Sequence, residues 1–363
     1  MNTSILTFED VMAFDKRNAE VYSDILKLHK GKGLIPFLGA GISVSAGFMT
    51  WDGFLKHEYY EFMNGRIQPM DPLDAASELF NVLGAASFRK DIVKSFGGEY
   101  SDADWNNIMS RIQSEAAALL PKLFNDIIIT TNFDRLLEHL YPAAIISHPG
   151  HNGQLNLAIQ VGASTIFKLH GCVSEPDEII FTRESYMKAY PRTGRKTSVV
   201  RALDKIFTSQ TILFLGCSLK DDDTIKHWSR IISKPEGKSI EHFAIINCTS
   251  DCCQKKRRDL GNMNIRPILY DSGNDNRNHN AVRVILEHLS LDLNIESHKT
   301  RTSNIDSFNK QANELFDFVN KTTDNKLNIV VNNIKGDLLS NNATKTDWGS
   351  GNTIHNLTIN HNN

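Results

Sequence analysis

The stretch "LIPFLGAGISVSAGF", residues 34–48, decides the fold class of this chain. Its apolar run ends in Gly39, Ala40 and Gly41, and a small, hydroxyl-rich segment follows. A strand that leads through a glycine turn into a helix can direct backbone N–H groups at a phosphate. The Walker A pattern is absent, because no Gly-Lys-Ser/Thr follows, and Val44 stands where the dinucleotide pattern G-x-G-x-x-G needs its third glycine. Taken alone, the turn fits a purely structural turn as well as a nucleotide site.

Composition and charge exclude several classes of protein. The 363 residues include 40 Lys and Arg and 42 Asp and Glu, for a net charge of −2. Proteins that bind duplex nucleic acid usually carry a basic domain, so we expect no direct binding of duplex nucleic acid. Five cysteines in a chain of this length indicate a reducing compartment rather than a disulfide scaffold. The first residues lack the layout of a signal peptide, and no apolar run approaches the ~18–20 residues that span a bilayer. We therefore expect a soluble, cytoplasmic protein with no membrane segment.

Short apolar runs alternate with helical patterns along the chain. After residues 34–38, runs of strand length occur at 126–130, 164–169, 211–216, 243–247 and 265–270. Helical patterns separate several of them, at 182–208, 220–233 and 278–290. Strands that are apolar throughout are typically covered on both faces. The alternation predicts an α/β fold with a Rossmann-like, doubly wound parallel sheet.

Composition also predicts how the chain is divided. Residues 1–33 form an N-terminal helical segment with a helix over 7–29, and residues 34–292 form the main domain. Within that domain, residues 51–124 carry spaced apolar residues and predict a mainly helical insertion. Residues 293–363 form a small C-terminal extension with a tail rich in Asn, Thr and Gly. Two interpretations of this tail stay open, a disordered segment or a β element that pairs with a second copy or a partner.

Small or polar residues follow the predicted strands at their carboxyl ends, where parallel α/β sheets bind ligands. They are Asn132 and Asp134, His170, Gly216 and Ser218, and Asn247. Each has a simpler explanation taken singly: Asp134 as a helix cap, His170 as a satisfied histidine, Asn247 as the end of a turn. Separate structural roles of this kind explain a whole set of such residues at one edge of a sheet less well than a shared ligand site does.

The order of these motifs resembles the NAD-binding domain of the sirtuins. "GAGISVSAG", "TTNFD", "KLHG", "LGCSL" and "IIN" follow one another as the family's motifs do, each at a strand end. The resemblance implies NAD+ as the substrate, with Asn132 and His170 as catalytic residues. It further implies a set of NAD-binding residues: Gly39, Ala40, Gly41, Ser43, Asp134, Gly216, Ser218 and Asn247. Of these, Asp134 would hold the nicotinamide carboxamide.

The departures from the sirtuin pattern concern the acyl-lysine substrate. After the glycine turn, "GFMTW" replaces the usual Gly-Ile-Pro-Asp-Phe-Arg-like segment, and Thr131 replaces the usual Gln before Asn132. The deacetylase zinc module needs two Cys-x-x-Cys pairs, which this chain lacks, so we expect no structural zinc and no other metal. These features resemble the sirtuin-like NAD hydrolases of bacterial antiphage defence, of the Thoeris type or associated with HerA.

The resemblance to this branch implies an NAD+ glycohydrolase that cleaves the nicotinamide–ribose bond and depletes NAD+ in abortive infection. Since such an activity harms the host, we expect gating by homo-oligomer assembly, a partner ATPase or a phage-derived trigger. Two alternatives stay open: an NAD-dependent deacylase or ADP-ribosyltransferase, and a non-catalytic sensor of NAD or ADP-ribose.

Overall fold

The computed structural model describes residues 6–31, 33–63, 71–148, 163–191, 195–219, 240–273, 280–294 and 310. The chain divides into two compact units, Met1–Asn294 and Ile295–Asn363. The predicted helix at 220–233 lies outside the described residues. So does the C-terminal extension apart from residue 310, and the two interpretations of its tail stay predictions. The boundaries expected at residues 33 and 292 stay predictions as well.

The first unit is built on one seven-stranded sheet with the strand order β3-β4-β2-β1-β5-β6-β7. The strands are β1 (Leu34–Leu38), β2 (Ile127–Thr130), β3 (Ile145–Ser147), β4 (Thr165–Lys168), β5 (Thr211–Leu215), β6 (His242–Asn247) and β7 (Ile265–Tyr270). Every neighbouring pair runs parallel. The predicted α/β fold with a Rossmann-like parallel sheet is therefore confirmed. The sequence patterns missed β3, which has three residues and an exposed first residue, Ile145.

Successive residues of the central strands are buried in two separate cores. In β1, Leu34 and Leu38 belong to one core and Ile35 and Phe37 to the other. Helices α2 (Asn18–Lys30), α7 (Asp102–Arg111), α8 (Leu120–Leu123) and α9 (Leu136–Leu140) contribute to the first core, as does the helical segment 280–294. Helices α12 (Ser198–Ser209) and α14 (Cys253–Gly261) contribute to the second. The sheet is thus covered on both faces, as continuous apolar strands predict.

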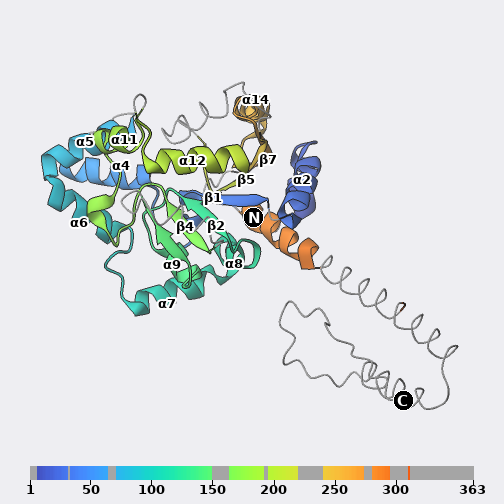
Figure 1. Cartoon of the computed structure of the whole chain (residues 1–363), viewed down its shortest axis with the longest axis horizontal. Helices are drawn as coiled ribbons and strands as arrows, with labels where there is room; N and C mark the ends of the chain where they lie inside the picture. Colours follow the sequence, from blue (N-terminus) through green and yellow to red (C-terminus); the bar gives the residue numbers. More distant parts are fainter. Residues whose placement is uncertain are drawn as a thin grey trace, which may run out of the picture. The chain divides into compact units, whose positions relative to one another are not determined.

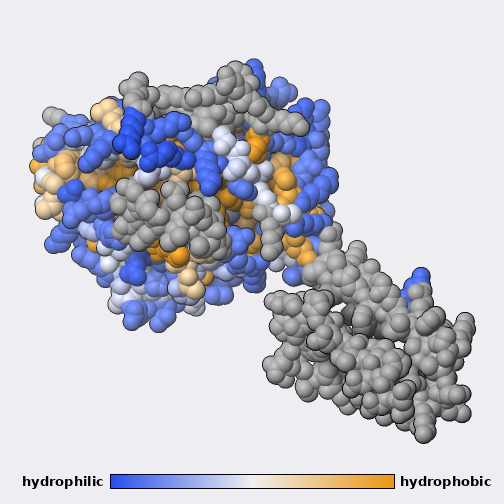
Figure 2. Space-filling view, in the orientation of Figure 1, coloured by the Kyte–Doolittle hydropathy of each residue, from blue (hydrophilic) through white to orange (hydrophobic). Residues whose placement is uncertain are grey.

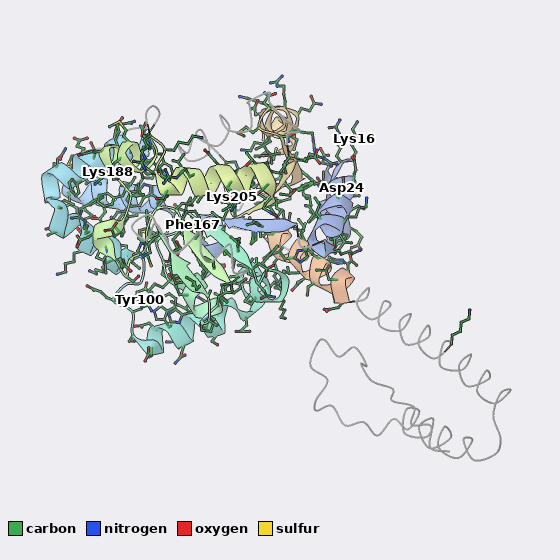
Figure 3. The ribbon with its side chains drawn as sticks, in the orientation of Figure 1. Lys16, Asp24, Tyr100, Phe167, Lys188 and Lys205 are labelled. Carbon is green, nitrogen blue, oxygen red and sulfur yellow. The ribbon has the colours of Figure 1, made fainter. Side chains whose placement is uncertain are left out.

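Helix α12 lies along one face of the sheet, over β1 and β5 (Figure 1). Figure 3 shows Phe167 of β4 within the sheet and Lys205 on α12. The Phe167 side chain is 1% exposed and packs in the same core as Leu203 of α12. Burying one such side chain contributes roughly 1.5–3 kcal/mol. Packing of this kind stabilises the position of α12 on the sheet.

The N-terminal segment forms two helices, α1 (Phe8–Phe14) and α2, where the periodicity predicted one. The capping box of Thr7 and Asp10 starts α1, and the chain turns at Asp15, whose carboxylate accepts from the Arg17 backbone. At the start of α2, the buried Asn18 donates to the Leu269 carbonyl (2.7 Å) and accepts from the Leu269 N–H (3.0 Å). This side chain fastens α2 to β7.

Helices make up most of the described residues between 51 and 124, and the assignment of this range as an insertion stays a prediction. They are α4 (Trp51–Phe62), α5 (Pro72–Leu83), α6 (Ala85–Ser95), α7 and α8, together with two 3₁₀ turns. Helices α4, α5 and α6 gather with α11 (Arg183–Ala189) at one end of the sheet (Figure 1). Helices α4, α5 and α6 share a third core, rich in aromatic residues, with Phe133 and Phe181 from the loops that follow β2 and β4. The insertion therefore packs directly on two of the strand-end loops.

Hydrophilic residues predominate on the visible surface of the described residues, and apolar residues show between them (Figure 2). Within the described ranges, every helix is too short or too polar to cross a bilayer.

Candidate functional site

Four strands end at the same height in the middle of the sheet. Leu38 of β1 is the register partner of both Thr130 in β2 and Leu215 in β5, and Thr130 is in turn the partner of Lys168 in β4. The strand order reverses at β1, since β2 lies on one side of it and β5 on the other. This reversal is the place where open parallel sheets bind ligands. The glycine turn, Asn132, His170 and Gly216 all follow this row of residues directly.

The glycine turn after β1 packs against the turn after β5. The Gly39 N–H donates to the Leu215 carbonyl and the Gly41 N–H to the Gly216 carbonyl, both at 2.9 Å. A Cβ atom on Gly41 would lie 2.9 Å from Gly216 Cα, and one on Gly39 would lie 2.6 Å from Gly216 O. Gly216 itself has a φ of +65°, which favours glycine. Close contact between two backbone turns therefore explains these three glycines without any ligand.

The short helix α3 (Ala40–Val44) follows this turn and carries Ser43. Ser43 is buried, whereas Ala40 and Gly41 are partly exposed at the start of the helix. Asn132, in the loop after β2, donates through Nδ2 to Ser43 Oγ (2.9 Å) and to the Gly39 carbonyl (3.1 Å). Its own backbone N–H donates to Thr130 Oγ1. The structure thus brings together Asn132, Ser43 and the glycine turn.

The bonds of Asn132 leave its acceptor side open. Both of its amide hydrogens point to protein acceptors. Among the described residues, none donates a hydrogen bond to Asn132 Oδ1. Two contacts hold the side chain, so this oxygen has a fixed position at the strand ends. The residue is only partly buried.

Asp134 holds the backbone at the start of α9 (Leu136–Leu140). It is 4% exposed, and its Oδ1 accepts from the Leu136 N–H (3.0 Å) in the first turn of α9. Burial raises the pKa of this carboxyl, against the opposing effect of the nearby Lys168. The contact with Leu136 agrees with the simpler explanation for Asp134, while a hydrogen bond with the Ser43 side chain, which lowers the pKa of the carboxyl, also connects Asp134 to the glycine turn.

Lys168, at the end of β4, is fully buried beneath the strand ends. Its Nζ donates to Glu138 Oε1 (2.7 Å), to Cys172 Sγ (3.3 Å) and to the backbone carbonyl of Asp134. Burial alone would lower the pKa of Lys168, but Glu138, Cys172 and Asp134 together raise it, so the ammonium stays charged. Sequence reasoning missed this group. A lysine in a strand that is otherwise apolar could have indicated it, because a buried charge needs partners.

His170 follows β4, the strand that pairs with β2 on the side away from β1. Thr130 and Lys168 are register partners, so Asn132 and His170, each two residues further on, leave neighbouring strands at the same height. The His170 side chain is 5% exposed, and the Tyr186 hydroxyl lies 2.8 Å from its Nε2 and 3.1 Å from its Nδ1. Tyr186 belongs to α11, and no pattern in the sequence pointed to it.

The turn after His170 is fixed by backbone contacts. The His170 carbonyl accepts from the Ile180 N–H at 2.9 Å. Gly171 has a φ of +88°, and a Cβ there would lie 2.8 Å from the Glu178 carbonyl. Ile180 also lines an open cavity of about 550 Å³ between this loop, α11 and the start of α12. Its lining includes both acidic residues, Asp177 and Glu178, and basic ones, among them Lys188 of α11, labelled in Figure 3.

The two remaining predicted residues lie on the other side of β1. Ser218 is exposed after β5, and its carbonyl accepts from Lys256 Nζ (3.2 Å) of α14. Asn247, at the end of β6, donates to Ser272 Oγ (2.9 Å) and accepts from the Ser272 N–H (3.0 Å). Asn247 thus closes a turn, which was its simpler explanation. It is separated from β1 by β5, so it lies further from the glycine turn than Asn132 does.

Metal ligands do not gather in the part of the chain that the structure describes: no group of three or more His, Cys, Asp or Glu residues there could hold an ion. Cys172 belongs to the network of Lys168, and Cys217 packs against the Phe37 and Leu215 carbonyls.

The fold and these strand-end motifs define a sirtuin-like α/β protein. The SIR2-like domain family matches residues 126–268, from β2 to β7. The resemblance expected from the sequence motifs is therefore confirmed, and over these residues the chain is similar to the SIR2-like domain family.

Three curated relatives bear the name NAD(+) hydrolase ThsA. The one from Cytobacillus dafuensis is 28% identical over 304 residues, covering 75% of this chain and 56% of the relative. The one from Acinetobacter baumannii (strain 532279) is 24% identical over 256 residues, covering 66% and 50%. The one from Bacillus cereus (strain MSX-D12) is 22% identical over 288 residues, covering 73% and 54%. The chain thus spans about half the length of these relatives.

Proposed function

We propose that this chain is an NAD+ glycohydrolase, which cleaves the nicotinamide–ribose bond to give nicotinamide and ADP-ribose. One observation carries the proposal: Asn132 is locked to the glycine turn through Gly39 and Ser43, with His170 at the end of the adjacent strand. The names of the three relatives support the same activity. In this proposal, the diphosphate lies at the partly exposed start of α3, and Gly216, Ser218 and Asn247 extend the site toward the adenosine.

The reaction needs little acid catalysis. Nicotinamide is bound to ribose as a cation and departs neutral, through an oxocarbenium-like state of the kind that glycoside cleavage involves. The protein must hold the ribose, stabilise the charge at the anomeric carbon and direct a water molecule to it. We assign the first and third tasks to Asn132 Oδ1, whose orientation is set by the two donor contacts of Nδ2.

His170 is the proposed general base toward the attacking water or a ribose hydroxyl, because an imidazole accepts a proton readily near neutral pH. The contact with the Tyr186 hydroxyl holds the ring in place. Asp134 takes a positioning role in this proposal, since its buried carboxylate holds the start of α9 and so fixes the loop that carries Asn132. The expected contact between Asp134 and the nicotinamide carboxamide stays part of the proposal.

Regulation follows from the same proposal. Unrestrained NAD+ consumption would harm the host, so the activity must be gated. We propose that the chain acts in the cytoplasm as an antiphage effector. Its gate is homo-oligomer assembly, a partner ATPase or a phage-derived trigger, and activation leads to abortive infection.

The test measures nicotinamide release from NAD+ by the purified chain, and NAD+ levels in phage-infected cells that express it. His170→Ala should lower the rate by on the order of 10²–10⁴-fold, as expected for a lost general base. Asn132→Ala should lower it by on the order of 10²–10³-fold. His57→Ala and Asn81→Ala are matched controls, because both residues are exposed on helices of the insertion. Intact NAD+ under every condition, or full activity in both site variants, would overturn the proposal. Binding of NAD+ without turnover would favour the sensor alternative.

A further inference from the structure

Three cysteine side chains meet at the start of α14, immediately after Asn247. Cys248 Sγ lies 2.9 Å from Cys252 Sγ and 3.0 Å from Cys253 Sγ. All three are free thiols. We propose that this thiol cluster, Cys248, Cys252 and Cys253, is a site of reversible oxidation, in which a hydroperoxide oxidises Cys252 and Cys248 then closes a disulfide with it. The proposal does not depend on NAD+ hydrolysis.

Cys252 has the surroundings of the attacking thiol. It is exposed, and its Sγ accepts from the Thr249 hydroxyl at 3.4 Å as well as contacting Cys248. These hydrogen bonds, from Cys248 first and Thr249 second, lower the pKa of the Cys252 thiol. Because the thiolate is the reactive form, a lowered pKa and exposure together favour oxidation at this sulfur.

The other two thiols are placed as donors. Cys248 is buried, which raises the pKa of its thiol, and its Sγ contacts both of the other sulfurs. Cys253 donates to the Thr249 carbonyl (3.3 Å). Cys248 therefore reacts second, and only once Cys252 has become electrophilic.

The chemistry balances with a hydroperoxide as the oxidant. The Cys252 thiolate attacks the peroxide oxygen, the O–O bond breaks, and sulfenic acid forms with release of water or an alcohol. The Cys248 sulfur then attacks the Cys252 sulfur, the S–O bond breaks, and the Cys248 proton leaves with the hydroxide as water. The two thiols have together lost two electrons and two protons. A thiol reductant reverses the change.

The sequence around the cluster allows a direct test on the full chain. Trypsin cleaves after Lys238 and Lys255 and releases one peptide that holds all three cysteines. After treatment with hydrogen peroxide and alkylation, this peptide should carry one alkyl group instead of three, and dithiothreitol should restore three. Endoproteinase Asp-N cleaves before Asp251, between Cys248 and Cys252, so a Cys248–Cys252 disulfide keeps the two fragments linked.

Variants separate the roles. Cys252→Ser should keep two alkylated thiols after peroxide, whereas Cys253→Ser, the matched control, should lose both by forming the disulfide. Cys172 and Cys217 serve as internal references in the same digest. The proposal fails if the tryptic peptide still carries three alkyl groups when Cys217 is already oxidised. It also fails if the Asp-N fragments separate, which would mean a Cys252–Cys253 bond, or if Cys252→Ser oxidises like the unchanged chain.

Discussion

Replacing Lys168 by methionine tests whether a buried charge holds the strand-end loops together. The change keeps the length of the side chain and removes the ammonium. It leaves the Glu138 carboxylate, whose side chain is 15% exposed, without its cation, and it leaves the Asp134 carbonyl without its Lys168 donor. Removing one partner of a buried ion pair typically costs about 3–5 kcal/mol. We expect Lys168→Met to lower the free energy of unfolding by that amount.

The assay is urea unfolding followed by intrinsic tryptophan fluorescence, with the free energy extrapolated to zero urea. The double variant Lys168→Met/Glu138→Gln should recover most of the loss, because residue 138 then carries no unpaired charge. Lys56→Met is the matched control. Its partner is Asp52 on the surface of α4, with the two side chains 63% and 50% exposed, so it should cost less than about 1 kcal/mol. A loss below about 1 kcal/mol for Lys168→Met, or a double variant as unstable as the single one, would refute the reasoning.

Two further predictions concern stability. Gly41→Ala should lower the free energy of unfolding by about 1–3 kcal/mol, because the new methyl group meets the backbone of Gly216. Gly261→Ala is the control and should be neutral or slightly stabilising, because a Cβ there meets nothing within 4 Å. Equal effects of the two changes in urea unfolding would contradict this prediction. Burial lowers the pKa of His242 to about 4, and its Nδ1 accepts a hydrogen bond from the Ile212 N–H. Between pH 6.5 and 4, His242 is therefore neutral in the folded chain, whereas in the unfolded chain, with a pKa near 6.5, it binds a proton. Stability should therefore fall as pH drops from about 6.5 to about 4, by roughly 3 kcal/mol from this residue. His242→Asn keeps an acceptor without a titrating ring and should flatten the pH dependence of the unfolding free energy; an unchanged slope would rule out this source.

Sequence patterns predicted the parts of the fold that depend on local signals. The apolar runs located β1, β2 and β4 to β7, because strands covered on both faces are apolar throughout. Strand ends could be located in the same way, which is how Asn132 and His170 were identified as candidate site residues. The β3 strand was missed because three residues are too few to show a periodic pattern.

Other features depend on contacts between distant segments. Tyr186 reaches His170 from α11, and Glu138 reaches Lys168 from α9, and neither residue stands out among its neighbours in sequence. The glycines of the first turn were correctly read as marking a tight bend. Their contact with Gly216 depends on the order of the strands, which the local pattern leaves open.

The amide of Asn18 has a consequence for how this protein behaves in a crowded cell. β7 is the last strand of its sheet, and an edge strand offers unpaired backbone groups to any other chain with an extended segment. By bonding both the N–H and the carbonyl of Leu269, one asparagine side chain imitates the peptide group of a neighbouring strand. The helix that carries it therefore shields the edge of the sheet. Loss of this one side chain would expose a surface at which molecules of the protein could join into larger β aggregates.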